Sequence, residues 1–297
     1  MTTRTRGSSP RGTAPFGDQT VTVPVDDDRE LTYAEYGCSE GVPVVFLHGT
    51  PGSRRLGMAF ETVAEELGIR LLSLDRPGYG RSSPWPDRAI HDAGEFVSAV
   101  LDDADVGTAG VIGFSGGSPY ALATAAALPE RIDRVDIVAG ATPPDVSEAT
   151  PAMQRLLAGL ATKAPFVLRG LFRGQALLAD HLDPSLVVDQ YTAAETDEPV
   201  PDDVAEIVRT DFLEAFARHR CGAVTEFRNT ATDWGIDFAD VDSRVHLWHG
   251  ENDTNVPIED ARRFEGRIST AELHVLEDAD HLRTLLRGVP RLLEDYR

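Results

Sequence analysis

The stretch Gly113-Phe114-Ser115-Gly116-Gly117 places one serine between glycines. An apolar run, residues 109–112, precedes the stretch, and a run of small residues with helical character, 119–128, follows it. A strand, a sharp turn and a helix in this order expose a serine hydroxyl so that it can act as a nucleophile. Glycines suit such a turn because its backbone segments approach too closely for a Cβ atom. The stretch therefore predicts a nucleophilic Ser115.

Strand patterns and helix patterns alternate along most of the chain. Strands are expected at 43–47, 69–74, 109–112, 135–139, 245–248 and 272–276, and helices at 58–67, 91–103, 119–128, 258–267 and 282–296. This alternation predicts an α/β fold with a mostly parallel sheet flanked by helices. Residues 19–25 and 31–36 alternate apolar and polar side chains around an acidic turn, which predicts an antiparallel hairpin.

The alternation is interrupted once, between residues 143 and 232. This region contains helical patterns at 153–161, 165–178 and 204–218 and no convincing strand. We therefore predict a helical cap inserted over 143–232 into a core formed by 19–142 and 233–297. Residues 1–18 are rich in Thr, Arg, Gly, Ser and Pro and lack the apolar segment of a secretory signal, so we expect a disordered tail.

The composition is strongly acidic, with 49 Asp and Glu against 28 Lys and Arg and a net charge of −21. Such a surface repels nucleic acid and anionic membranes, so we expect a small-molecule substrate and neither of those partners. Adaptation to a salt-rich cytosol is the favoured origin of the charge, with codon bias as the alternative. Cys38 and Cys221 are expected to be free thiols in the cytoplasm. No feature of the sequence indicates an oligomeric state.

A serine hydroxyl needs a base that takes its proton and a third group that orients the base. His281 follows the last predicted strand and is therefore expected at the same sheet edge as Ser115. His249 and His48 also follow strands, but each precedes a glycine in a turn, where bracing the loop by hydrogen bonds is the favoured role. His281 is the predicted base, and His249 is the alternative.

Asp253 is the predicted orienting acid because it follows a strand and lies between Ser115 and His281 in the chain. Glu251 is the alternative acid. Asp278 and Asp280 are interpreted as surface charges. No His and carboxylate cluster shows the spacing of metal ligands, so we expect no metal and no other cofactor.

A tetrahedral intermediate also needs hydrogen-bond donors for its oxyanion. The residue after the nucleophile, Gly116, is expected to supply one backbone N–H. The loop after the strand 43–47 is expected to supply the second, from Thr50.

Five motifs together resemble those of the α/β-hydrolase superfamily. They are HGTPGS at 48–53, DRPGYGRS at 75–82, GFSGG at 113–117, HGEND at 249–253 and DH at 280–281. The resemblance covers the chain from about residue 20 onward. It implies a Ser115, Asp253 and His281 triad and a cap over the site, in agreement with the predicted insertion.

Within the superfamily, the first loop is similar to that of proline iminopeptidase-like members. Those members typically have glycine at the position of Thr50 and tryptophan soon after the nucleophile. In this chain, Ser115 is followed by Gly116, Gly117 and Ser118, without a tryptophan. Epoxide hydrolases and haloalkane dehalogenases use an aspartate nucleophile, and Ser115 argues against both.

The expected function is that of a serine hydrolase that forms an acyl-enzyme, with a small or medium carboxylic ester as the favoured substrate. Three alternatives stay open. The first is an aminopeptidase or amidase of the proline iminopeptidase type, in which a cap residue such as Glu195 or Glu198 holds an amine. The second is a hydrolase that cleaves carbon–carbon bonds of diketones, and the third is a non-catalytic ligand-binding protein with this fold.

For several other side chains, a structural role is the favoured interpretation. The apolar cap residues are expected to pack on the core, with an acyl pocket as the alternative. They are Leu156, Leu157, Phe166, Leu171 and Phe172. Arg54 and Arg55 are expected to form salt bridges, with a substrate carboxylate as the alternative partner. Trp234 and Trp248 are expected in the core.

Overall fold

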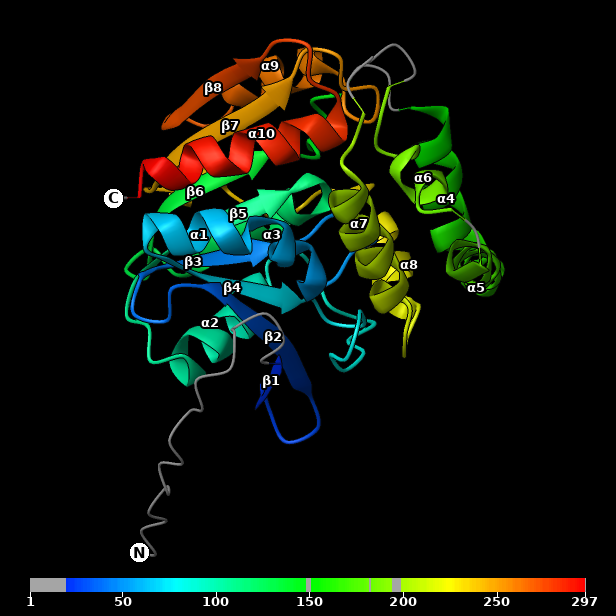
Figure 1. Cartoon of the computed structure of the whole chain (residues 1–297), viewed down its shortest axis with the longest axis horizontal. Coiled ribbons are helices and arrows are strands. Elements are labelled where there is room, and N and C mark those ends of the chain that lie inside the picture. Colours follow the sequence, from blue (N-terminus) through cyan, green and yellow to red (C-terminus); the bar gives the residue numbers. More distant parts are fainter. Residues whose placement is uncertain (1–19, 148–150, 182, 194–198, 297) are drawn as a thin grey trace, which may run out of the picture.

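A computed structural model describes residues 20–147, 151–181, 183–193 and 199–296, and the predicted tail lies outside them. The described strands are β1 (Thr20–Pro24), β2 (Glu30–Gly37), β3 (Val42–Leu47), β4 (Ile69–Asp75), β5 (Ala109–Phe114), β6 (Ile132–Val138), β7 (Arg244–Gly250) and β8 (Ala271–Leu276). They form an eight-stranded sheet in the order β1-β2-β4-β3-β5-β6-β7-β8 (Figure 1). The pairs β1–β2 and β2–β4 are antiparallel, and the pairs from β4 to β8 are parallel. The predicted hairpin and the mostly parallel sheet are confirmed.

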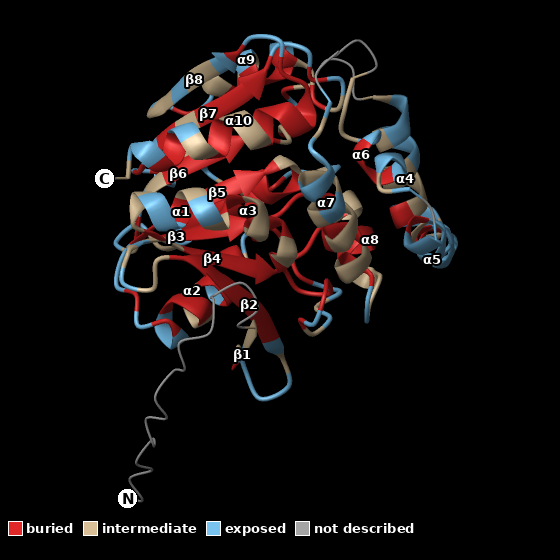
Figure 2. Cartoon of the chain, in the orientation of Figure 1, coloured by how far each residue is buried: buried red, intermediate tan, exposed pale blue. Residues whose placement is uncertain are grey.

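The central strands are the apolar runs of the sequence. Every residue of β5 and the last four residues of β3 are buried, as expected for strands covered on both faces (Figure 2). In the parallel register, Leu47 lies opposite Leu74 on one side and Gly113 on the other. The loops that begin at His48, Arg76 and Ser115 therefore leave the sheet at one edge, as the sequence predicts.

Helices cover both faces of the sheet. One face packs against α1 (Glu61–Leu67) and α10 (His281–Glu294), and the other packs against α2 (Ala93–Asp103), α3 (Ser118–Ala127) and α9 (Ile258–Glu265). The predicted helix over 58–67 is partly wrong, because the 3₁₀ helix η1 (Arg54–Phe60) precedes α1. The side chain of Ser53 accepts a hydrogen bond from the N–H of Arg55 and starts this extra segment.

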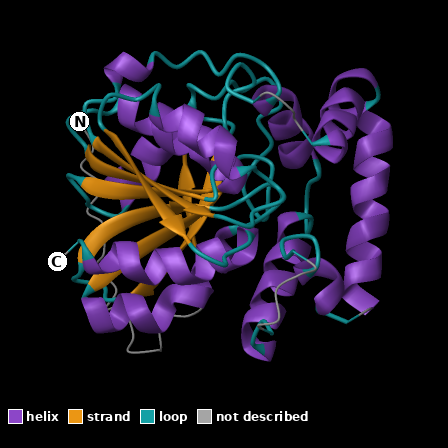
Figure 3. Cartoon of the chain, turned by 90° about the horizontal axis from the view of Figure 1, so that it is seen from above, coloured by secondary structure: helices purple, strands orange, loops and turns teal. Residues whose placement is uncertain are grey.

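Five described helices lie between β6 and β7, within the predicted cap. They are α4 (Ala152–Lys163), α5 (Pro165–His181), α6 (Ser185–Val188), α7 (Asp202–Ala215) and α8 (Cys221–Thr230). They stand beside the edge at which the parallel strands end (Figures 1 and 3). Residues 148–150, 182 and 194–198, with Glu195 and Glu198, lie outside the described part of the chain. No described helix is both long and apolar enough to cross a bilayer.

Helix α8 is absent from the sequence prediction because its buried residues are of mixed character. Ala223 and Val224 are apolar, but Gly222, Thr225 and Glu226 are buried with them. A buried glutamate interrupts the apolar spacing by which a helix is identified from sequence.

The apolar cap residues have different environments. Phe172 is buried and its ring is stacked on the rings of Phe216 and Phe227 at centroid distances of 5.1 and 6.0 Å. Phe172 also belongs to the buried hydrophobic cluster that contains residues of the central strands, so packing on the core is confirmed for it, as it is for Trp234 and Trp248. It is wrong for three others that are more than half exposed on the outer helices, and these are Leu156, Phe166 and Leu171.

Gly110 in β5 provides a test of how tightly the sheet is packed. A Cβ atom at this position would overlap the phenol ring of Tyr296, whose hydroxyl donates to Asp136 over 2.8 Å. We expect Gly110→Ala to lower the free energy of unfolding by about 1–3 kcal/mol because it overpacks the core. Urea denaturation measures the change. Gly107→Ala is the control because an added Cβ there has no atom within 4 Å, and equal effects would contradict the prediction.

Candidate active site

Ser115 stands at a strained turn between β5 and α3. Its φ angle is 49°, in the left-handed region that a non-glycine residue rarely adopts. A Cβ atom on Gly113 would lie 2.9 Å from the Cα of Ser118, and one on Gly117 would overlap the carbonyl of Leu47. The hydroxyl of Ser118 donates to the carbonyl oxygen of Ser115 over 2.5 Å. The glycines are required because the turn is pressed against β3 and against the start of the helix.

His281 and Asp253 form a buried hydrogen-bonded pair. The Nδ1 atom of His281 lies 2.7 Å from Oδ2 of Asp253. The other oxygen, Oδ1, accepts the N–H groups of Asn255 and Val256 over 2.8 and 3.0 Å. Burial alone would raise the pKa of Asp253, but the charge and hydrogen bond of His281, with smaller contributions from His249 and Val256, hold that pKa below its ordinary value. Asp253 is thus an anion whose position is fixed on both oxygens.

The imidazole of His281 lies between two aromatic rings. Its centroid is 5.1 Å from that of Phe114, the residue before Ser115, and 6.2 Å from that of Tyr191, which is nearly parallel to it at 12°. The N–H of Leu282 donates to the carbonyl of Tyr191 over 2.9 Å. The cap segment that carries Tyr191 therefore fixes the imidazole beside the serine turn.

Asp280 is not the surface charge expected from sequence. It is 1% exposed, and its Oδ1 accepts the N–H of Arg283 as the N-cap of α10, while Oδ2 accepts the N–H of Ala193 over 3.1 Å. An N-cap acceptor satisfies a backbone donor at the start of a helix, which is here the helix that begins with His281.

The alternative base and acid are engaged elsewhere or exposed. His249 donates from Nε2 to the carbonyl of Val256 over 2.8 Å, and burial lowers its pKa. His48 bonds to the carbonyl of Gly49 through Nδ1 over 2.7 Å and accepts the N–H of Arg76 through Nε2 over 3.2 Å. Glu251 is exposed to solvent, whereas Asp253 is buried. His48 and His249 therefore stabilise their loops through hydrogen bonds, as expected from the sequence.

Thr50 and Gly116 lie against each other at the end of the sheet. A Cβ atom on Gly116 would overlap the side chain of Thr50 and would lie 3.3 Å from its backbone nitrogen. The hydroxyl of Thr50 donates to Glu226 of α8 over 2.6 Å. The loop that carries the Thr50 amide is therefore anchored by the cap.

Glu226 is the centre of a buried ionic cluster. Its carboxylate accepts hydrogen bonds from Thr50, from the hydroxyl of Tyr79 over 2.7 Å, from Arg76 over 2.8 and 2.7 Å, and from Arg88 over 2.7 Å. Burial alone would raise the pKa of Glu226, but the two guanidinium groups lower it to about 2. Two positive groups and one negative group leave one net positive charge beneath the loop that contains Thr50.

A second cap carboxylate, Asp211 of α7, holds the same loop three residues later. One oxygen of Asp211 accepts the N–H and the hydroxyl of Ser53, both over 2.7 Å, and the N–H of Leu56 over 3.1 Å. Burial is the main cause that raises the pKa of Asp211 to about 7. Arg54 pairs with Asp75 and Glu214 at 2.7 and 2.6 Å, which confirms the predicted salt bridging, although Arg54 is buried.

Sequence reasoning missed Asp211 and Glu226. Both lie in the cap, 158 and 176 residues away from the loop residues that they bind. In a chain with 49 acidic residues, no local pattern separates two buried carboxylates from the exposed ones.

Removal of the charge of Glu226 is expected to destabilise the fold. Glu226→Gln leaves Arg76 and Arg88 buried without an anion, which typically costs about 3–5 kcal/mol in the free energy of unfolding. Glu206→Gln is the control, because Glu206 forms an exposed ion pair with Arg209 at 2.8 Å. Exposed pairs contribute about 0–1 kcal/mol. Similar urea midpoints for the two variants would show that the buried cluster stabilises the fold no more than an exposed ion pair does.

Asp211 is expected to make stability depend on pH. Its pKa is about 7 in the folded chain and near 3.8 without the fold, so the folded state binds more protons between these values. The free energy of unfolding should therefore fall as pH rises through this window, by about 1.4 kcal/mol per unit of pKa shift. Asp211→Asn keeps the acceptor oxygen and loses the titration. The stability of the wild type relative to this variant, measured from about pH 4 to about pH 8, should fall, and a constant difference would contradict the assignment.

Comparison with known proteins places the chain in a family. The family model described as "alpha/beta hydrolase fold" matches residues 42–285. The chain is 27% identical over 250 residues to a 2-hydroxy-6-oxononadienedioate/2-hydroxy-6-oxononatrienedioate hydrolase of Cupriavidus pinatubonensis, with 80% of each chain covered. It is 26% identical over 281 residues to a hydrolase of the same description from Pseudomonas putida, with 91% of this chain and 92% of that protein covered.

Solved structures agree in fold. A bromoperoxidase from Bacillus anthracis matches with a TM-score of 0.72 at 17% identity, over 94% of this chain and 99% of that one. An enol-lactonase from Burkholderia xenovorans matches with a TM-score of 0.70 at 19% identity, over 92% and 98%. An esterase from a Rhodococcus species matches with a TM-score of 0.66 at 18% identity, over 94% and 100%. The family match spans most of the chain, and the sheet order and these structures agree with it, so the protein belongs to the α/β-hydrolase fold family.

Proposed function

We propose that the protein is a serine hydrolase in which Ser115, His281 and Asp253 form the catalytic triad. The observation that carries the proposal is the 2.7 Å hydrogen bond between His281 and Asp253 beside a serine held in a left-handed turn. The bond occupies Nδ1 of the imidazole, so Nε2 is the nitrogen that serves as base. An orienting carboxylate of this kind fixes the tautomer and stabilises the imidazolium that forms during the reaction.

The reaction proceeds in two steps through an acyl-enzyme. In the first, the hydroxyl oxygen of Ser115 bonds to the carbonyl carbon of the substrate while Nε2 of His281 takes its proton. The N–H groups of Thr50 and Gly116 stabilise the oxyanion, and His281 returns the proton to the leaving group as its bond breaks. In the second step, water gives a proton to His281 and attacks the acyl carbon, and the serine leaves with that proton.

The favoured substrate is a small or medium carboxylic ester. The arginines next to the loop after β3 already have carboxylate partners: Arg54 pairs with Asp75, and Arg76 and Arg88 pair with Glu226. A substrate carboxylate would have to compete with these buried pairs, whereas a neutral ester would not. The esterase among the structural neighbours is consistent with this choice.

A carbon–carbon bond hydrolase is the second candidate, and the relatives named as hydrolases of 2-hydroxy-6-oxononadienedioate favour it. Such a substrate is a dianion. It would draw on the net positive charge of the Arg76, Arg88 and Glu226 cluster beneath the loop. A panel of nitrophenyl acyl esters, aminoacyl amides and 2-hydroxy-6-oxononadienedioate separates the candidates. Rapid ester turnover with slow dioate cleavage supports the esterase, and the reverse order supports the second candidate.

Variants of the triad test the proposal directly. Ser115→Ala should lower kcat on a nitrophenyl acyl ester by about 10⁴-fold or more and abolish labelling by a fluorophosphonate. Asp253→Asn should lower kcat by about 10⁴-fold because it favours the wrong imidazole tautomer. Glu251→Gln, at an exposed acid two residues away, is the matched control and should leave kcat nearly unchanged. Full activity or labelling in Ser115→Ala would refute the nucleophile, and an unlabelled wild type would indicate a binding protein.

We further propose a cytoplasmic location, which the free thiols of Cys38 and Cys221 support.

A further inference from the structure

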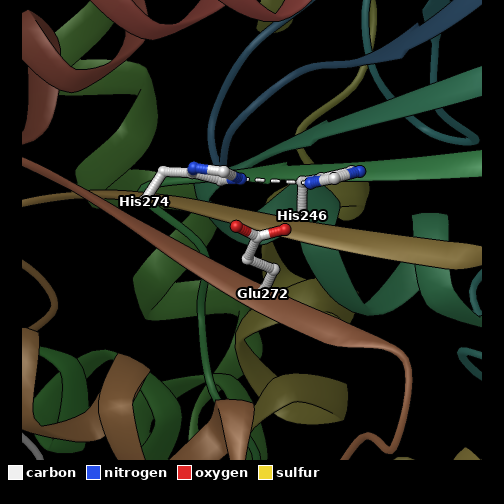
Figure 4. A group of neighbouring side chains, drawn as sticks. All are labelled: His246, Glu272 and His274. Atoms are coloured by element: carbon white, nitrogen blue, oxygen red, sulfur yellow. Dashed lines mark hydrogen bonds between the residues drawn. The ribbon is translucent and has the colours of Figure 1, made fainter.

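Two histidines and a glutamate meet on the last two strands of the sheet, apart from the proposed triad (Figure 4). His246 lies in β7, and Glu272 and His274 lie in β8. One side-chain atom of each that can act as a ligand lies within 4.8 Å of the others. The Nδ1 atom of His246 and the Nε2 atom of His274 are 3.1 Å apart.

The register of the sheet produces this arrangement. His246 is paired with Glu272, and two residues further Trp248 is paired with His274. Residues two apart in a strand point to the same face, so these four side chains share one face of the sheet. The sequence gives no spacing signal for the cluster because its members come from two strands separated by α9.

The cluster rests on a fixed support. The ring of His274 is stacked on that of Trp248 at a centroid distance of 4.3 Å and an angle of 20°. Trp248 is buried, and its indole N–H donates to Asp136 over 3.1 Å. Both imidazoles are partly buried, while Glu272 is exposed and adjusts its side chain at little cost. Preorganised imidazoles lose little entropy when they bind a ligand.

We propose that His246, Glu272 and His274 bind a divalent cation of the zinc class. Tetrahedral zinc with Zn–N bonds of 2.0–2.1 Å separates two ligand nitrogens by about 3.3 Å, which is close to the separation of the imidazole nitrogens here. Two facing nitrogens at this distance need either a proton or a metal between them, since two lone pairs would repel. The cation replaces that proton, the carboxylate of Glu272 is the third ligand, and water completes the shell.

The ligand set selects among metals. Two imidazoles and one carboxylate suit zinc and its transition-metal neighbours, whereas magnesium and calcium prefer oxygen ligands. Both imidazoles bind the metal in their neutral form, so binding should weaken as they become protonated at low pH.

The metal site is expected to stabilise the pairing of the edge strand rather than to take part in hydrolysis. His246 lies three residues before His249, a distance of about 10 Å along a strand. In the described sheet, β8 is an edge strand that pairs only with β7. A metal bound by both strands therefore holds the edge strand to its one neighbour.

Calorimetric titration of the full chain with Zn²⁺ in the presence of excess Mg²⁺ tests the proposal. Mg²⁺ occupies the carboxylate clusters of an acidic surface, so a remaining 1:1 isotherm reports an imidazole site. Co²⁺ is the spectroscopic probe, and tetrahedral binding should give intense visible absorption bands. Absence of the isotherm, or a Co²⁺ spectrum without tetrahedral bands, would overturn the proposal. Both measurements use the wild-type protein, so this test does not depend on whether a variant folds.

Variants assign the ligands. His246→Gln, His274→Gln and Glu272→Gln should each weaken the Kd for Zn²⁺ by at least about ten-fold. Glu272 is exposed, so its variant is expected to fold even if an imidazole variant does not. His91→Gln is the control, because His91 has an exposed side chain in another part of the chain. Zn²⁺ should raise the urea midpoint of the wild type and of His91→Gln only. Unchanged affinity in Glu272→Gln and in either folded imidazole variant would refute the site.

Discussion

The buried carboxylate of Glu226 between the guanidinium groups of Arg76 and Arg88 is the interaction on which the candidate site depends. It joins α8 of the cap to the loop after β4, and through Thr50 it also fixes the loop after β3. Removing a charge from water is costly, and only close partners with complete hydrogen bonding repay that cost. Each partner therefore fixes the position of the others. Glu226, Arg76, Arg88 and Thr50 form one electrostatic unit that joins the cap to the edge of the sheet.

This unit limits what the cap can do as a lid. If α7 and α8 moved away from the sheet, Glu226 would separate from two arginines and Asp211 would separate from the backbone of Ser53 and Leu56. Such motion would expose three charges and leave several donors without acceptors. The outer helices α4 and α5 carry exposed apolar side chains such as Phe166 and Leu171. A movement of the outer helices would leave the contacts of Glu226 and Asp211 intact, whereas a movement of α7 and α8 would break them.

The sheet and the positions of Ser115, Asp253 and His281 could be predicted because the signals are local. Continuous apolar runs identify buried strands, and parallel strands bring the loops that follow them to one edge. The cap was predicted less well, since α8 buries a glutamate where the usual pattern has an apolar residue. Asp280, Asp211 and Glu226 could not be distinguished from surface acids, because burial depends on partners that lie far away in the chain. The proximity of His246 to Glu272 and His274 depends on the register of β7 and β8, which the sequence does not specify.

The ionic cluster also bears on how such a protein can change its specificity over evolutionary time. A cap inserted between two strands is a module that could in principle be exchanged while the sheet stays intact. Here an incoming cap would have to bring its own anion to Arg76 and Arg88, or both arginines would have to change with it. Substitutions in the outer helices leave this cluster intact, whereas a transplanted cap would first have to match the charge of the two arginines.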